Sequence, residues 1–147
     1  VLMHMLGEPE TMQASPHYNN LLFDIKYFFL TRMREASRAG IQEDSLILDP
    51  GIGFGKTVED NLKIINNLDY YHELKRPILI GPSRKSFIGK ILGVGPENRL
   101  EGTISAVIMS YLRGAIIFRV HDVKEVKRAL QVAESIVKEI KVAGQDV

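Results

Sequence analysis

The chain has no cysteine among its 147 residues, and neither sign of charge is in clear excess. Without cysteine there is no disulfide framework and no thiolate zinc site, so the fold must depend on packing, which suits a reducing cytoplasm. Lysine and arginine number 19 and the acidic residues 18, a net charge of +1 that gives no long-range field. No apolar run approaches the roughly 18 residues of a membrane span. We therefore expect a cytoplasmic protein that binds neither nucleic acid nor membrane.

The chain does have enough apolar material for one core, because 45% of its residues are hydrophobic. Four short, nearly continuous apolar runs are expected to be strands, at residues 1–5, 45–49, 77–81 and 115–120. They lack the polar alternation of a sheet with one wet face, which favours a parallel sheet covered on both faces. A helical pattern follows each run, so right-handed crossovers should connect the strands.

Apolar spacing and end signals place the helices. The first has Gly40 as its stop signal and an apolar face formed by Leu22, Ile25, Phe29, Met33 and Ala36. The second has Thr57 as N-cap, Asp60 in the capping-box position and an apolar face formed by Val58, Leu62, Ile65 and Leu68. Further helices are expected over residues 83–92 and 100–113, and a last one with Val126, Leu130, Ala133, Val137 and Ile140 on one side.

Four strand–helix units fit two architectures. They can form a small open doubly wound sheet, or half of an eight-unit barrel of roughly 250 residues. Val1 already reads like the interior of a strand, which favours the half-barrel and a chain cut from something longer. In both architectures ligands bind beyond the carboxyl ends of the strands.

Chemically capable residues follow the second, third and fourth runs, in the segments 49–56, 81–86 and 119–122. Singly, they have ordinary explanations: Asp49 before Pro50 is a good turn residue, and Lys85 can be a solvated lysine at a helix start. Because parallel strands end at the same rim, their convergence indicates a ligand site.

The glycine-rich residues 51–57 do not have the spacing of a phosphate-binding loop. A Walker loop needs glycine where Pro50 stands, and a dinucleotide fingerprint beginning at Gly51 needs glycine where Lys56 stands. We interpret the segment as a loop whose glycines place Phe54 over a flat ligand near Asp49.

Arg119 and His121 alternate along the last strand and can point the same way. A guanidinium beside an imidazole suits a phosphate or pyrophosphate, because both donate charge-assisted hydrogen bonds. An alternative stays open, in which Arg119 forms an ion pair with Asp122 or Glu125. The other histidines have no neighbours at metal-ligand spacing, so no metal cage is expected within this chain.

Five segments together resemble dihydropteroate synthase of the bacterial folate pathway, in the family's order and through nearly the whole chain. They are Met3-His4-Met5 with Gly7-Glu8-Pro9 and Thr11-Met12-Gln13, Asp49-Pro50-Gly51-Ile52-Gly53-Phe54-Gly55-Lys56, Gly81-Pro82-Ser83-Arg84-Lys85-Ser86-Phe87-Ile88-Gly89, Arg99-Leu100-Glu101-Gly102-Thr103 and Arg119-Val120-His121-Asp122-Val123. The likeness is to the C-terminal half of a family whose fold is an eight-stranded barrel. It implies one domain over residues 1–147: an α/β fold of parallel (β/α) units, half of a TIM-type (β/α)8 barrel, with strands five to eight.

The resemblance implies a transferase that joins p-aminobenzoate to the pyrophosphate ester of 6-hydroxymethyl-7,8-dihydropterin, releasing pyrophosphate and forming 7,8-dihydropteroate. By the same resemblance, Asp49 would hold the amino-pyrimidine edge of the pterin and Lys85 would bond its ring. Met3 would pack on the ring face, and Gly81 would let the ring lie close to the strand end.

The second substrate and the leaving group have their own implied residues. Phe54, the alkyl stem of Lys85 and Ser86 would line the p-aminobenzoate pocket, and Arg119 and His121 would bind the pyrophosphate. Lys85, Arg119 and His121 would be the catalytic residues, because cationic donors stabilise the charge that grows on a departing pyrophosphate.

The resemblance also implies parts outside this chain. The family's metal-coordinating asparagine and remaining pterin-binding residues belong to its N-terminal half, so Mg²⁺ is expected to bind through the substrate pyrophosphate, with its protein ligand in that half. The implied partners are the two substrates, the N-terminal half-barrel and a second copy in a homodimer of the full enzyme, a sulfonamide target. Two alternatives stay open: an inactive structural half-barrel, and a pterin-binding barrel that moves a methyl group from methyltetrahydrofolate to a corrinoid.

Overall fold

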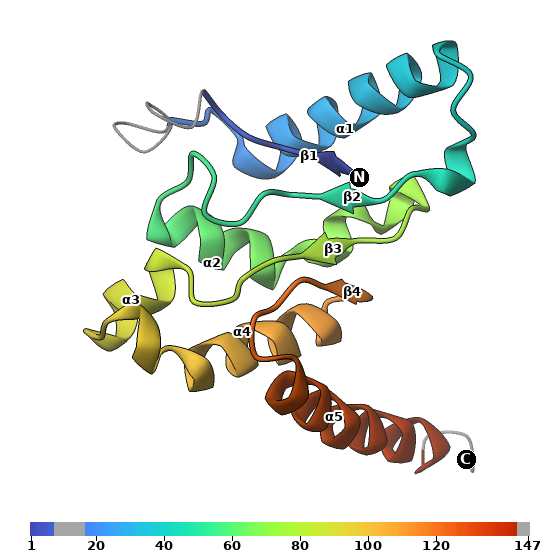
Figure 1. Cartoon of the computed structure of the whole chain (residues 1–147). Helices are drawn as coiled ribbons and strands as arrows, with labels where there is room; N and C mark the ends of the chain where they lie inside the picture. The colour runs from blue at the N-terminus through green and yellow to red at the C-terminus, as the bar shows by residue number, and fades with distance from the viewer. Residues whose placement is uncertain (8–16, 144–147) are drawn as a thin grey trace.

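The computed structural model describes residues 1–7 and 17–143, with the side chains of the last helix described as far as residue 139. Strands and helices alternate in the order that the sequence predicts (Figure 1). The strands are β1 (Leu2–Met3), β2 (Leu48–Asp49), β3 (Leu79–Ile80) and β4 (Ile117–Phe118). The helices are α1 (Leu21–Arg38), α2 (Val58–Asn66), α3 (Ser86–Leu92), α4 (Leu100–Leu112) and α5 (Val123–Ala143), with 3-10 turns η1 (Glu43–Ser45), η2 (Leu68–Leu74) and η3 (Pro96–Asn98).

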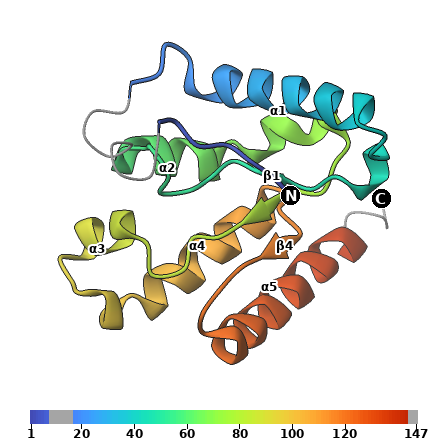
Figure 2. The same ribbon diagram turned by 45° about the horizontal axis from the view of Figure 1, so that its top comes forward.

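The four strands follow one another in chain order, and α1 and α5 lie at opposite ends of the row (Figure 2). In the parallel pair β1–β2, Leu2 lies opposite Leu48, and in the parallel pair β3–β4, Leu79 lies opposite Ile117. A parallel bridge between Leu48 and Ile78 connects the two pairs. The α/β fold with parallel strands is confirmed, but each hydrogen-bonded strand is only 2 residues long. A run of apolar residues indicates which residues are buried, but it does not indicate how many of them form strand hydrogen bonds.

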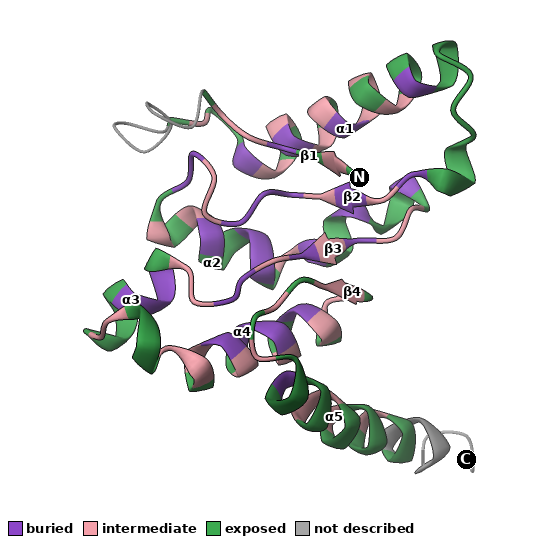
Figure 3. Ribbon diagram, viewed as in Figure 1, coloured by how far each residue is buried: buried purple, intermediate pink, exposed green. Residues whose placement is uncertain are grey.

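One face of the strands is better covered than the other (Figure 3). Leu48, Ile78 and Ile80 are fully buried in a core shared with α1, α2, α3 and α4. Leu79, whose side chain alternates with those of the buried Ile78 and Ile80, is only half-buried, and so is Ile117, which lies opposite it on β4. The expectation of two covered faces is therefore wrong for the described residues, because right-handed crossovers between neighbouring strands keep the helices on one side.

The predicted cap of α2 is confirmed, but one residue of its expected apolar face and the expected start of α3 are not. Asp60 and Thr57 form the capping box: the Asp60 amide donates to Thr57 Oγ1 at 3.1 Å, and the Thr57 amide donates to Asp60 Oδ2 at 3.0 Å. Leu62, expected to be buried, is 45% exposed. The helix expected over residues 83–92 begins only at Ser86, because Arg84 has a left-handed φ of 56° that a right-handed helix excludes. No helix in the described part of the chain is both long and apolar enough to span a bilayer.

Candidate functional site at the carboxyl rim

The parallel strands end at a common rim, which brings distant segments together. The amide of His4 donates to the carbonyl of Asp49 at 2.9 Å, which joins the ends of β1 and β2. The amide of Arg119 donates to the carbonyl of Ile80 at 3.0 Å, which joins the ends of β3 and β4. The motif residues 8–13 lie outside the described residues.

Asp49 has one committed oxygen and one available oxygen. Its Oδ1 accepts a hydrogen bond of 2.8 Å from the amide of Gly51, the turn contact expected of an aspartate in this position. Oδ2 has no hydrogen-bond partner among the described residues, so it can accept from a ligand. Burial raises the pKa of Asp49, while the Gly51 N–H and the positive charges of Lys85, Lys56 and Arg119 oppose the rise.

Residues 50–57, which we call the glycine loop, curl back against the end of β1. Gly51, Gly53 and Gly55 have φ values of 71°, 79° and 62°, in the left-handed region that glycine adopts without strain. A Cβ at Gly51 would clash with the carbonyl oxygen of His4. The loop sets the ring of Phe54 beside Lys85, whose Nζ lies 3.9 Å from the ring centroid.

A buried lysine and a buried histidine support this loop; both belong to motifs seen in the sequence, but the sequence did not indicate that they are buried together. Lys56 is only 3% exposed, and its Nζ donates to the Phe54 carbonyl at 2.9 Å and lies 3.1 Å from Nδ1 of His4. Burial lowers the pKa of Lys56 to about 7, and burial together with the Lys56 charge lowers the pKa of His4 to about 4. His4 is therefore neutral at pH 7 and accepts from Lys56. Loop lysines are ordinarily exposed, so no signal in the sequence marked Lys56 as buried.

Lys85 is not a freely solvated lysine, although it is the N-cap residue of α3. Its stem lies across Gly53, where an added Cβ would come within 2.9 Å of Lys85 Cδ. Burial lowers the pKa of Lys85, an effect that Asp49 opposes and Arg119 reinforces. Lys85 thus places a cation between the glycine loop and the ends of β3 and β4.

Three other residues expected at the site have different surroundings. Met3 lies opposite Asp49 on the neighbouring strand and is 38% exposed, so its side chain can still contact a ligand. Ser86, the first residue of α3, is exposed. A Cβ at Gly81 would meet only ordinary contacts at 3.8 Å with Arg119, so the chain itself leaves room at this position.

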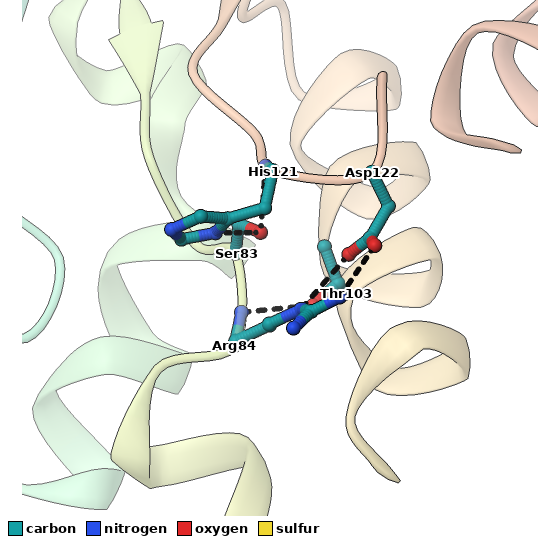
Figure 4. Close-up of polar contacts among 5 residues, drawn as sticks. All are labelled: Ser83, Arg84, Thr103, His121 and Asp122. Atoms are coloured by element: carbon teal, nitrogen blue, oxygen red, sulfur yellow. Dashed lines mark hydrogen bonds and ion pairs between the residues drawn. The ribbon is translucent and has the colours of Figure 1, made fainter. Parts of the chain in front are cut away.

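A cavity of about 110 Å³, which we call the β3–β4 cavity, is lined by Gly81, Ser83, Lys85, Arg119, Val120 and His121. Ser83 Oγ accepts the amide N–H of His121 at 3.2 Å and lies 2.8 Å from Nδ1 of its ring (Figure 4). A serine that accepts this amide can donate its own proton to Nδ1. The neutral ring then carries its proton on Nε2, which becomes a donor for an oxyanion.

Asp122 pairs with Arg84 rather than with Arg119. Arg84 Nε donates to Oδ2 at 3.1 Å and Arg84 Nη2 donates to Oδ1 at 2.6 Å (Figure 4). These bonds hold the pKa of Asp122 below its usual value. Within the described residues no ion pair joins Arg119 to Glu125, so Arg119 stays exposed on the cavity wall.

The described residues contain no cluster of three or more histidine or acidic side chains that could hold a metal ion. At the rim, one oxygen of Asp49 is engaged by Gly51 and Asp122 is engaged by Arg84, whereas Lys85 and Arg119 are cations. Magnesium prefers several oxygen ligands in octahedral geometry. This donor set does not fit a protein-held Mg²⁺.

Residues 1–121 match the family model described as pterin binding enzyme. The chain belongs to this family, which agrees with an α/β fold whose strands end at a rim of one carboxylate and several cations.

The relatives of the chain are more specific than the family. It is 42% identical to the dihydropteroate synthase of Escherichia coli (strain K12) over 134 residues, which cover 91% of this chain and 48% of the relative. The crystal structure of Yersinia pestis dihydropteroate synthase with a sulfonamide drug has a TM-score of 0.91 at 40% identity, over 93% of this chain and 50% of that one. The structure of Xanthomonas albilineans dihydropteroate synthase in complex with 7,8-dihydropteroate has a TM-score of 0.84 at 38% identity. The match covers 92% of this chain and 49% of that one. The resemblance seen in the sequence is confirmed, and the chain spans about half the length of the relatives it matches.

Proposed function

We propose that this chain is the C-terminal half of a dihydropteroate synthase, which joins p-aminobenzoate to the pyrophosphate ester of 6-hydroxymethyl-7,8-dihydropterin. The observation that carries the proposal is the convergence of Asp49 with Lys85, Arg119 and His121 at one rim. The Xanthomonas albilineans relative binds 7,8-dihydropteroate, the product of this reaction.

The pterin ring belongs at the ends of β1 and β2. Oδ2 of Asp49 accepts from the N–H groups of its amino-pyrimidine edge, and Lys85 donates to an acceptor on the ring. Met3 packs on one face of the ring, and Gly81 leaves space for the opposite edge. p-Aminobenzoate lies toward Phe54, the Lys85 stem and Ser86, which places its amine next to the pterin methylene carbon.

The reaction breaks the C–O bond between that carbon and pyrophosphate and forms a C–N bond to the amine, which releases one proton to solvent. Negative charge grows on the departing oxygen as the C–O bond breaks. Arg119 and Nε2 of His121 line the β3–β4 cavity and donate to that charge. Stabilisation of the leaving group is therefore the main catalytic contribution of this half, with Lys85 adding its positive charge.

We propose further that β1 to β4 are strands five to eight of an eight-stranded barrel and that an N-terminal half-barrel completes the site. Val1, beside β1, and Ile116, beside β4, are 70% and 65% exposed at the two ends of the strand row. Bare strand edges invite pairing with further strands. The completed enzyme would be a cytoplasmic homodimer, with Mg²⁺ bound through the substrate pyrophosphate and held by the N-terminal half.

The test fuses the unmatched N-terminal part of the Escherichia coli relative to this chain. We expect the fusion to form dihydropteroate from the pterin pyrophosphate and radiolabelled p-aminobenzoate, whereas the chain alone forms none. A fusion that is folded but inactive would contradict the proposal. Transfer of a methyl group from methyltetrahydrofolate to a corrinoid would favour the other enzyme class, whose reaction releases no pyrophosphate.

The assignment of the leaving-group site has its own test. Arg119→Gln should leave the affinity for the unphosphorylated pterin alcohol nearly unchanged. It should lower the affinity for the pyrophosphate ester, because only the ester reaches the β3–β4 cavity. Arg113→Gln, at the C-cap of α4, is the control. Equal losses for alcohol and ester would move the anion site elsewhere.

A further inference from the structure

The turn at residues 83–85 is held from several directions. Arg84 is one of two non-glycine residues with positive φ in the described chain, a conformation that needs support from its surroundings. Its amide donates to Oγ1 of the fully buried Thr103 at 3.0 Å, and Nη1 of Arg99 donates to its carbonyl at 2.9 Å. The start of α4 therefore fixes the backbone of Arg84 on both sides.

The side chain of Arg84 then reaches the segment after β4. Its two parallel bonds to Asp122 run beside the contact between Ser83 and His121 (Figure 4). The ion pair thus connects a residue adjacent to Ser83 with a residue adjacent to His121. Neither Arg84 nor Asp122 lines the β3–β4 cavity, yet each directly precedes or follows residues that do.

We propose that Arg84 and Asp122 are positioning residues, whose two-bonded ion pair locks the turn after β3 against the segment after β4 and thereby shapes the β3–β4 cavity for an anion. A planar guanidinium that makes two parallel bonds to a carboxylate fixes orientation as well as distance. Small misplacements of charged groups strongly weaken their action on a reacting group. The inference rests on the proposed function only for the identity of the anion, pyrophosphate.

The test measures pyrophosphate binding by calorimetry on this chain and turnover on the fusion described above. Asp122→Asn should weaken pyrophosphate binding about ten-fold and lower kcat by a similar factor, because the Ser83 and His121 segments lose their alignment. The affinity for the pterin alcohol should stay within about two-fold, since that ligand lies toward Asp49. Arg84→Lys keeps the charge without the planar fork and should show the same defect. Asp122→Glu, which keeps the carboxylate, should recover part of the binding.

Glu43→Gln is the matched control, because it breaks another arginine–carboxylate pair, Arg76 with Glu43 at 3.1 Å, that touches no rim residue. Pyrophosphate affinity in Asp122→Asn and Arg84→Lys equal to that of Glu43→Gln overturns the positioning role. The positioning role is also overturned if these variants weaken binding of the pterin alcohol and of pyrophosphate equally, which would indicate a general loss of structure. A fusion that binds pyrophosphate but makes no dihydropteroate refutes the proposed function, and the calorimetry still decides the positioning role.

Discussion

The two strand pairs end in rims that are held by opposite physical means. The glycine loop after β2 is held by backbone turns that only glycine adopts easily and by Lys56, a buried cation without a carboxylate bonded to it. The turn after β3 is held by Arg84, a partly exposed cation with a carboxylate partner. The first rim therefore depends on backbone shape and on the hydrogen bonds of a buried lysine, and the second on a charge pair.

This difference matches the work that each rim is proposed to do. A flat, largely neutral ring needs a fixed wall, which the buried glycine loop with Phe54 supplies. An anion needs donors of positive charge that stay available to it, and Arg119 and His121 are exposed at the mouth of the β3–β4 cavity. Four predictions test the comparison.

The largest expected effect is on the glycine loop. Gly51→Ala should lower the free energy of unfolding by about 3 kcal/mol or more, because the added Cβ meets the carbonyl oxygen of His4 in addition to the left-handed strain. Gly40→Ala is the matched control: φ is 81° there, but nothing lies within 4 Å of the added Cβ, so about 1 kcal/mol is expected. Urea denaturation measures both. Equal losses would show that the glycine loop is not sterically locked.

The next effect concerns binding at the first rim. Asp49→Ala in the fusion should weaken binding of the pterin alcohol by roughly 1.5–3 kcal/mol, the range for a hydrogen bond to a charged group. The affinity for pyrophosphate should change little. Calorimetry with each ligand separates the two effects. Asp44→Ala, in the exposed turn η1, is the control. Unchanged affinity for the alcohol would remove Asp49 from the site.

The third prediction uses the buried cation. Since the folded-state pKa of Lys56 is lowered from 10.5 to about 7, the unfolded chain binds more protons between these values, and stability should rise with pH through this window. We expect a gain of about 2 kcal/mol between pH 7 and 9. Lys56→Met should remove most of this gain, whereas Lys90→Met, on the exposed side of α3, should keep it. A wild-type chain whose stability does not change over this range would contradict the burial argument.

The smallest effect on stability is expected at the second rim. Asp122→Asn should lower the thermal midpoint only slightly at pH 7, because partly exposed ion pairs contribute little to stability. The pKa of Asp122 is held below 3.8 in the folded state, so the contribution is present above that pH and disappears as the pH falls through the folded pKa. Thermal melts of wild type and variant should therefore converge in acid. A variant that is strongly destabilised at pH 7 would make the pair structural rather than positioning.

The sequence alone determined the order of the strands and helices and most of the rim. Apolar runs, the capping box of Thr57 and the stop at Gly40 are local signals, because burial period and cap hydrogen bonds involve residues a few positions apart. The resemblance to a known family suggested the roles proposed for Asp49 and Lys85, which spacing by itself left open.

Only the tertiary structure decided which side chains meet. Arg84 and Asp122 are 38 positions apart, and Lys56 and His4 are 52 apart. No local feature of the sequence indicates that a loop lysine is buried. None indicates that Asp122 pairs with Arg84 rather than with Arg119, which is nearer in the sequence. These partners depend on how neighbouring strands place their loops, and that packing is set by the whole sheet and its helices rather than by any short stretch of sequence.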